Sequence, residues 1–225
     1  IQIGGLGVVT MTASVALLSG RKIGLMQRST MQEALSVSKM SGIVRLTGFI
    51  LKMTFIIELI GACVMAPVFC GQFGIGRGIW YAIFHSVSAF CNAGFDIFGS
   101  IAPGDSIITF NSDPVVCITL MILVAVGGLG FFVWEEVARV RRFKKFSVYT
   151  KLVLIASLVL TVGGAALIAL VEWNNPDTLG TMGIGDKILN SFFQSVTVRT
   201  AGFDSIGQGS MTDAGKAVSM ALMIV

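Results

Sequence analysis

The chain has 225 residues, of which 54% are hydrophobic and only 12% charged, and its net charge is +4. Because a soluble domain carries about 25% charged residues, so few charges with a mean hydropathy of +0.86 exclude an ordinary soluble domain and indicate an integral membrane protein. One histidine and four cysteines without paired spacing leave almost no material for a zinc centre, a disulfide framework or a catalytic dyad, so we expect no enzyme.

Apolar stretches of about the length needed to cross a ~30 Å hydrocarbon core recur along the chain. They cover Ile1–Leu18, Leu46–Val68, Val115–Val133 and Leu152–Val171. A Ser-Asp-Pro sequence is a typical helix start before the third stretch, and Thr212 with Asp213 begins a last helix. The basic residues lie at the ends of these stretches rather than on one polar face, which argues against nucleic-acid binding.

Two polar islands between the apolar stretches repeat each other. Phe84–Asp96 reads FHSVSAFCNAGFD, and Phe193–Asp204 reads FQSVTVRTAGFD, one residue shorter in the middle. Each is too short and too polar to cross a membrane. A short helix followed by a glycine-bearing turn between spanning helices is typical of a re-entrant pore loop, whose non-helical backbone is tolerated at membrane depth only under cover of protein or water. An ordinary extracellular turn is the alternative.

The composition of the islands suits a path for cations. Backbone carbonyls can replace the hydration shell of an ion if the chain runs extended with the carbonyls turned inward, and Gly94 and Gly202 supply the freedom this needs. The preceding short helices, over about 79–90 and 187–198, would point their partly negative C-terminal ends at the path. The aspartate two residues after each glycine would raise the local cation concentration.

The basic residues predict the orientation. If the loops at 20–52 and 139–151 share one side of the membrane, each holds six Lys and Arg residues, twelve in all, against four on the other side. Those four are Arg77, Lys187, Arg199 and Lys216. The positive-inside rule places the twelve in the cytoplasm, so both pore loops enter from outside.

A second repeat defines the unit. Gly-Gly-Leu-Gly occurs at 4–7 and again at 127–130, inside apolar stretches with no preceding strand, which favours close helix packing over a dinucleotide loop. Residues 1–45 are then the second helix of one module with a cytoplasmic linker. Residues 46–151 form a complete module with its pore loop at 79–96 and a basic cytoplasmic linker. Residues 152–225 hold the first helix, the pore loop at 187–204 and the start of the second helix of the next module, so we expect an internal piece of a longer protein.

Asn-Ala-Gly-Phe at 92–95, Val-Arg-Thr-Ala-Gly-Phe at 198–203 and the two Gly-Gly-Leu-Gly copies together resemble the bacterial Trk/Ktr/HKT potassium transporter superfamily, specifically the membrane subunit of the Ktr type. The resemblance implies an all-α membrane protein with four helix–pore loop–helix modules around one potassium-channel-like pore. It also implies Na+-dependent K+ uptake across the bacterial plasma membrane, a dimer of the membrane subunit, and a cytoplasmic ring of nucleotide-binding (RCK-type) regulatory subunits, the nucleotide being held only by that partner.

The resemblance assigns K+ to backbone carbonyls and assigns no catalytic or cofactor-binding residue. The filter carbonyls carried over by position are Asn92, Ala93, Gly94, Phe95, Thr200, Ala201, Gly202 and Phe203. Because the resemblance implies Na+-dependent uptake, Na+ is a second ion that the protein is expected to bind. Cys91-Asn92 and Arg199-Thr200 differ chemically, so the symmetry between the loops is approximate. Two other function classes stay open: a secondary transporter that rocks around a central site, and a membrane anchor for the cytoplasmic regulatory ring.

Three polar side chains carry separate expectations. A guanidinium facing the ion would repel it, so we expect Arg199 to point behind the filter and to pair with an acid or with carbonyls. Glu58, deep in a span, is either a carboxylate satisfied by a partner or an ion-coupling group. His85 is expected to be a packed or hydrogen-bonded residue of the first pore helix rather than a ligand.

Overall fold

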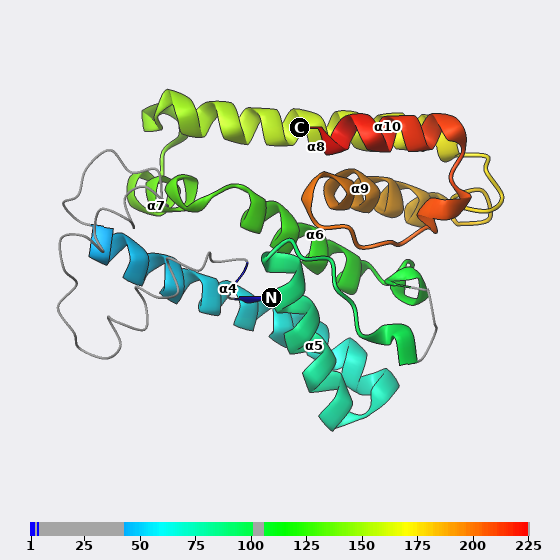
Figure 1. The fold of residues 1–225 in the computed structure, drawn as a ribbon, viewed down its shortest axis with the longest axis horizontal. Helices are drawn as coiled ribbons and strands as arrows, with labels where there is room; N and C mark the ends of the chain where they lie inside the picture. The colour runs from blue at the N-terminus through cyan, green and yellow to red at the C-terminus, as the bar shows by residue number, and fades with distance from the viewer. Residues whose placement is uncertain (3, 5–42, 101–105, 225) are drawn as a thin grey trace.

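The computed structural model describes residues 1–2, 4, 43–100 and 106–224 (Figure 1). Within these ranges every regular element is a helix, as the family resemblance implies. All but three residues of the predicted span at 1–18, most of the linker that follows it and most of the first Gly-Gly-Leu-Gly copy lie outside the described residues.

The α-helices are α4 (Ile43–Phe73), α5 (Ile75–Phe90), α6 (Pro114–Gly128), α7 (Phe131–Val140), α8 (Val148–Glu172), α9 (Ile184–Thr200) and α10 (Asp213–Met223). Short 3-10 turns lie at Phe98–Ser100, Ile108–Phe110, Phe143–Lys145 and Gln208–Ser210. Within the described ranges, Thr47–Phe73 of α4 and the whole of α8 are long and apolar enough to cross a membrane. These helices confirm the predicted spans at 46–68 and 152–171.

The predicted span Val115–Val133 is not one straight helix. The chain breaks after α6, and α7 continues at 98° to it. Gly130 between the two helices has φ 86°, a conformation that a helix cannot use and that glycine adopts without steric cost. Trp134 holds the bend by donating its ring N–H to the carbonyl of Val126 at 2.8 Å. The 15 residues of α6 extend about 22 Å, which is short of a ~30 Å hydrocarbon core.

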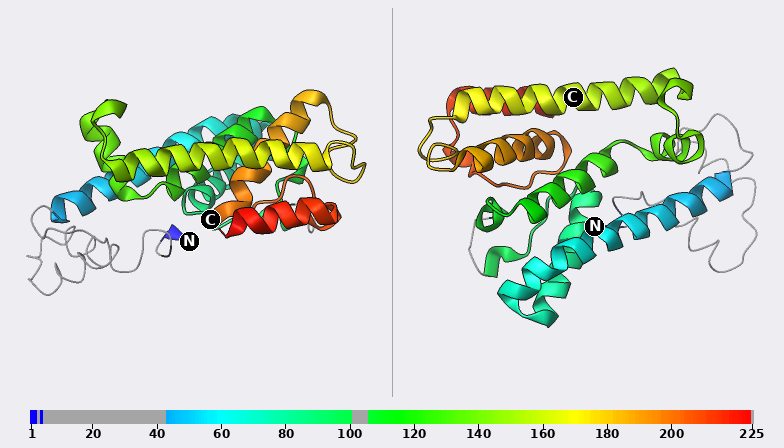
Figure 2. Two further views of the ribbon diagram at one scale, coloured as in Figure 1. Left: turned by 90° about the horizontal axis from the view of Figure 1, so that it is seen from above. Right: turned by 180° about the vertical axis from the view of Figure 1, so that it is seen from behind.

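The helices form two groups joined through α6 and α9. Helix α5 folds back on α4 and both contact α6, whereas α8, α9 and α10 pack on one another. Figures 1 and 2 show α8, α9 and α10 together, with α4 and α5 on the other side of α6. Each group is a long helix, a short helix and a further helix in chain order, so the two groups repeat one arrangement.

Local chemistry fixes the turns between these helices. The two predicted caps are confirmed: Asp113 accepts from the N–H groups of Val115 and Val116 at 2.9 and 3.2 Å to begin α6, and Thr212 accepts from Gly215 at 3.1 Å to begin α10. Between α4 and α5, Gly74 takes φ 81° in a one-residue connection. The short helices α5 and α9 both have their C-terminal ends toward the centre of the molecule (Figure 1).

Glu172 joins the end of α8 to the start of α10. Its fully buried carboxylate accepts hydrogen bonds from Asn175 (Nδ2, 2.7 Å), Thr178 (Oγ1, 2.7 Å) and Thr212 (N, 2.9 Å; Oγ1, 2.6 Å). A buried carboxylate is tolerated where donors surround it in this way. The connection therefore closes the second helix group around α9.

His85 is a packing residue, as expected. Its ring is fully buried and stacks on Phe98 with 4.3 Å between ring centroids. Its Nδ1 lies 2.7 Å from the carbonyl oxygen of Tyr81, one turn earlier in α5. Phe69 and Phe110 complete the aromatic cluster, which fastens α5 to α4 and to the loop after the first island.

Candidate functional site

The two polar islands fold in the same way at the ends of α5 and α9. Ser88 donates its hydroxyl to the carbonyl of Phe95 at 2.7 Å, and Thr197 donates to the carbonyl of Phe203 at 3.0 Å. The carbonyl of Ser88 accepts the N–H of Ala93, and the carbonyl of Thr197 accepts the N–H of Gly202, both at 2.9 Å. The Ser or Thr of each copy therefore clamps both ends of its own loop.

Both loops use left-handed backbone, though at different numbers of residues. Gly94 has φ 65° and Gly202 has φ 91°, so both glycines adopt a conformation that costs other residues about 1–2 kcal/mol. The first loop, which is one residue longer, has a second such position at Asn92, with φ 51°. Asparagine is one of the few residues that visit this region readily, which explains how the extra residue is accommodated.

The loops meet each other directly. A Cβ on Gly94 would overlap the carbonyl oxygen of Ala201, whereas a Cβ on Gly202 would have no described atom within 4 Å. Beyond the loops, the N–H of Ile107 donates to the carbonyl of Asp204 at 2.9 Å. The structure thus brings the two sets of sequence-predicted filter residues together at Gly94 and Ala201.

Asn92 links the first loop to both of its neighbours. With its amide nitrogen facing Val124 O (3.1 Å) and Thr200 Oγ1 (3.2 Å), its amide oxygen accepts the N–H of Gly128 at 3.1 Å. This orientation gives every amide atom a partner of the right polarity. A single side chain therefore connects the first loop, the second loop and α6.

The second Gly-Gly-Leu-Gly copy lies against the end of α5 and Asn92, and this contact explains why it holds glycines. A Cβ on Gly127 would overlap the carbonyl oxygen of Phe90, the last residue of α5, whereas a Cβ on Gly128 would lie 3.7 Å from the Asn92 amide. Close packing by small residues is confirmed, and the partner is the end of α5 and the loop after it. The remaining glycine, Gly130, makes the bend after α6.

The two aspartates after the glycines shape their own loops. Asp204 accepts from the N–H groups of Ile206, Gly207 and Gln208 at 3.1, 2.9 and 2.8 Å. Asp96 accepts from Phe98 at 3.2 Å. A carboxylate with three backbone donors is a strong loop cap, so this local role stands beside the expected attraction of cations.

A structural repeat extends beyond the motifs and was missed from the sequence. Ser86 of α5 donates to the carbonyl of Glu58 at 2.6 Å, and Ser195 of α9 donates to the carbonyl of Thr161 at 2.9 Å. Three residues later on the long helices, Gly61 and Gly164 face the same serines and leave no room for a Cβ. Glu58 and Ser86 are 28 residues apart, whereas Thr161 and Ser195 are 34 residues apart, because the connection from long to short helix is longer in the second copy. This difference hides the correspondence in the sequence.

The side chain of Arg199, at the end of α9, contacts α8. Its guanidinium donates to the carbonyl and the hydroxyl of Ser157, both at 3.2 Å, and to Thr161 Oγ1 at 3.4 Å. The expected pairing with carbonyls is confirmed. Glu58 is buried and accepts from Gln2 Nε2 at 3.0 Å, as expected of a carboxylate satisfied by a partner.

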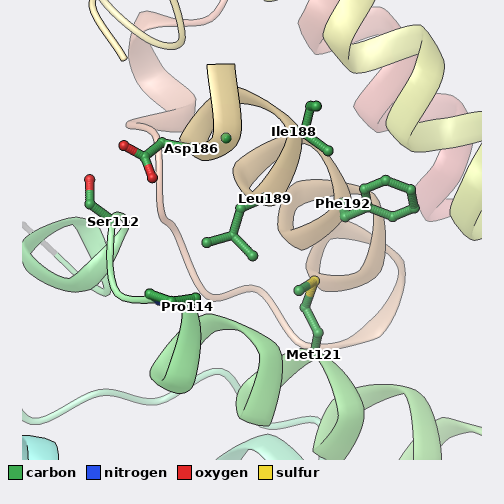
Figure 3. A pocket seen from close by; sticks show the side chains of 8 residues that line it. Ser112, Pro114, Met121, Asp186, Ile188, Leu189 and Phe192 are labelled. Atoms are coloured by element: carbon green, nitrogen blue, oxygen red, sulfur yellow. The ribbon is translucent and has the colours of Figure 1, made fainter. Parts of the chain in front are cut away.

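A separate groove of about 540 Å³ lies between the N-terminal ends of α6 and α9. Figure 3 shows Leu189 and Met121 pointing into it, with Asp186 and Ser112 at one end. Its lining is mostly apolar and lies at the opposite end of α9 from the loops. The groove therefore adds no ligand to the two glycine loops.

All 225 residues match the TrkH family, described as cation transport protein. The chain is 38% identical over its full length to the Ktr system potassium uptake protein B of Bacillus subtilis, and 37% identical to the potassium/sodium uptake protein NtpJ of Enterococcus hirae. It is also 37% identical to the Ktr system potassium uptake protein B of Vibrio alginolyticus. The chain covers 49% of each of these three relatives, about half their length. The match over the whole chain, together with two equivalent loops in helix groups that each begin with a membrane-length helix, shows that the protein is a membrane protein of the TrkH cation transport family.

Proposed function

We propose that the protein of which this chain is part moves K+ across the bacterial plasma membrane through a selectivity filter, and that the two glycine loops form half of it. The observation that supports this most directly is the contact between Gly94 and Ala201, where two loops with the same Ser or Thr clamp come together. Backbone carbonyls of 92–95 and 200–203 replace the hydration shell of the ion.

The short helices contribute to the electrostatics of the proposed filter. Helix α5 ends at Phe90, just before the first loop, and α9 ends at Thr200, the first residue of the second set of proposed filter carbonyls, so the partial negative charge of each C-terminus lies next to the ion path. The clamps from Ser88 and Thr197 preorganise the loops by fixing their carbonyls before an ion arrives. K+ is the transported substrate and passes down its electrochemical gradient without covalent chemistry.

The complete filter requires two further loops of the same kind. We assign α4 to α7 to one module, at 46–151, and α8 to α10 to the first part of the next, at 152–225. Because the chain covers about half of its relatives, four modules around one pore account for the full length. In that arrangement, Gly202 of the second loop faces the loop of the next module, just as Gly94 of the first loop faces Ala201 of the second.

The names of the relatives and the charge pattern support the finer parts of the proposal. Two relatives are named as B proteins of a Ktr system, which supports a system of more than one component. We propose a cytoplasmic RCK-type ring as the partner and a homodimer of the membrane subunit. One is named as a potassium/sodium uptake protein, which supports Na+-dependent uptake. The basic loop at 139–151 is cytoplasmic, and the glycine loops enter from outside.

The test is cation uptake by the full-length protein in bacterial cells that lack their own potassium uptake systems. Gly202→Ser forces a side chain into φ 91°, whereas the control Gly209→Ser has open space and no positive φ. We expect K+ uptake by the wild type, a lower preference for K+ over Na+ in Gly202→Ser, and no change in the control. Unchanged preference in Gly202→Ser at normal membrane abundance, with loss of binding to the cytoplasmic partner, would instead make the protein a membrane anchor.

A further inference from the structure

The space behind each loop is built from equivalent parts but holds opposite charges. The hydrogen bonds from Ser86 to Glu58 O and from Ser195 to Thr161 O align Glu58 with Thr161. The first of these positions carries the carboxylate of Glu58 itself, and the second, Thr161, is contacted by the guanidinium of Arg199. The two copies therefore differ in the sign of the charge behind their loops.

The carboxylate in the first copy reaches the residue that precedes the proposed filter. Glu58 is 5% exposed, and its Oε1 lies 4.0 Å from the Sγ of Cys91, the neighbour of Asn92. Its other oxygen accepts from Gln2, a neutral side chain. Among the residues that the structure describes, no basic side chain forms an ion pair with Glu58.

The charged residue in the second copy also adjoins its loop in the chain. Arg199 directly precedes Thr200, the first proposed filter residue, and its hydrogen-bond partners on α8 are all neutral. Within the described ranges it forms no ion pair with an acid. A charge at membrane depth that is hydrogen-bonded but not neutralised keeps its long-range field, which is only weakly screened away from water.

We propose that Glu58 and Arg199 are opposed specificity-determining residues, with Glu58 raising and Arg199 lowering the affinity of the filter for K+. This rests on the proposed function, because it assumes that the ion passes the two loops. A unit charge about 10 Å from an ion changes its affinity by roughly tenfold at an effective dielectric constant near 20. Opposed charges of this size leave the ion held firmly enough to be selected and loosely enough to leave.

The experiment compares Glu58→Gln, Arg199→Gln and the double variant in K+ uptake by the full-length protein, with KM and maximal rate measured separately. We expect the KM for K+ to rise about three- to tenfold in Glu58→Gln, to fall by a similar factor in Arg199→Gln, and to return toward the wild type in the double variant. Glu135→Gln, an exposed acid paired with Arg139, is the control and keeps the wild-type KM. A purely structural role would instead impair both single variants in the same direction.

Two further measurements distinguish a change in ion affinity from poor folding of the variants. Glu58→Asp and Arg199→Lys keep the charges, so they retain the wild-type KM if the field is responsible. K+-dependent thermal stabilisation of the purified full-length variants reports ion affinity without transport and should shift in the same opposite directions. KM values and K+ stabilisation that are unchanged, or that move the same way in both variants, overturn the inference. If the wild type itself moves no K+, the proposed function fails instead.

Discussion

The two adjacent glycines at the end of α6 allow a matched test of how the pore helix is seated. Gly127→Ala places a methyl group against the carbonyl oxygen of Phe90, at the point where α5 gives way to its loop. Gly128→Ala adds the same methyl group one residue later, at an ordinary 3.7 Å from the Asn92 amide. Both residues belong to the same helical turn, so the difference between the variants isolates the packing contact.

The magnitude follows from two opposing contributions. Alanine stabilises a helix by about 0.8–1.0 kcal/mol relative to glycine, and this applies to both positions. Overpacking against a fixed backbone group typically costs about 1–3 kcal/mol and applies only to Gly127. We therefore expect Gly128→Ala to be neutral or slightly stabilising, and Gly127→Ala to be net destabilising by up to about 2 kcal/mol.

The assay is thermal unfolding of the purified full-length protein, combined with K+ uptake in cells. Gly127→Ala should lower the apparent Tm by several degrees and impair uptake, because the displaced carbonyl belongs to the end of the pore helix. Gly128→Ala should preserve both properties. Equal behaviour of the two variants, or a Gly127→Ala protein as stable and active as the wild type, would refute the assigned seating of α5 on α6.

Three further predictions concern side chains whose hydrogen bonds hold the loops or the helix ends in place. Asn92→Leu removes the link between both loops and α6 and should reduce K+ over Na+ preference in uptake, whereas Asn92→Asp should lose less because one oxygen still accepts from Gly128. Ser88→Ala and Thr197→Val each remove one clamp, so each should lower stability by about 1 kcal/mol in thermal unfolding and lower selectivity for K+; unaltered selectivity in both would contradict the clamp. Glu172→Ala leaves buried donors unpaired and should destabilise by about 2–4 kcal/mol, seen as reduced abundance of folded protein.

The sequence predicted the parts of the fold that depend on local chemistry. Long apolar stretches gave α4 and α8, and the caps at Asp113 and Thr212 gave the starts of α6 and α10. The repeated islands predicted two similar loops, and their clamps from Ser88 and Thr197 occupy the same position in each. Each of these features depends on about a dozen neighbouring residues, so the local sequence pattern is enough to predict it.

Other features depend on contacts between distant segments or on a single backbone angle. The bend at Gly130 interrupts an apolar stretch that hydropathy alone describes as one span. Asn92 bridging to Val124 and Thr200 joins residues that are far apart in the chain. The alignment of Glu58 with Thr161 is displaced by a loop of different length, so only the shared serine contacts reveal it.

The central claim is that the carbonyls of 92–95 and 200–203 bind the transported ion. The most direct measurement is the anomalous scattering of Rb+, a K+ substitute, in crystals of the full-length protein. The account predicts Rb+ density on the axis between the two loops, coordinated by these carbonyls and weakened in Gly94→Ser. Rb+ density confined to other parts of the protein, with both loops ordered and free of ions at saturating Rb+, would contradict it.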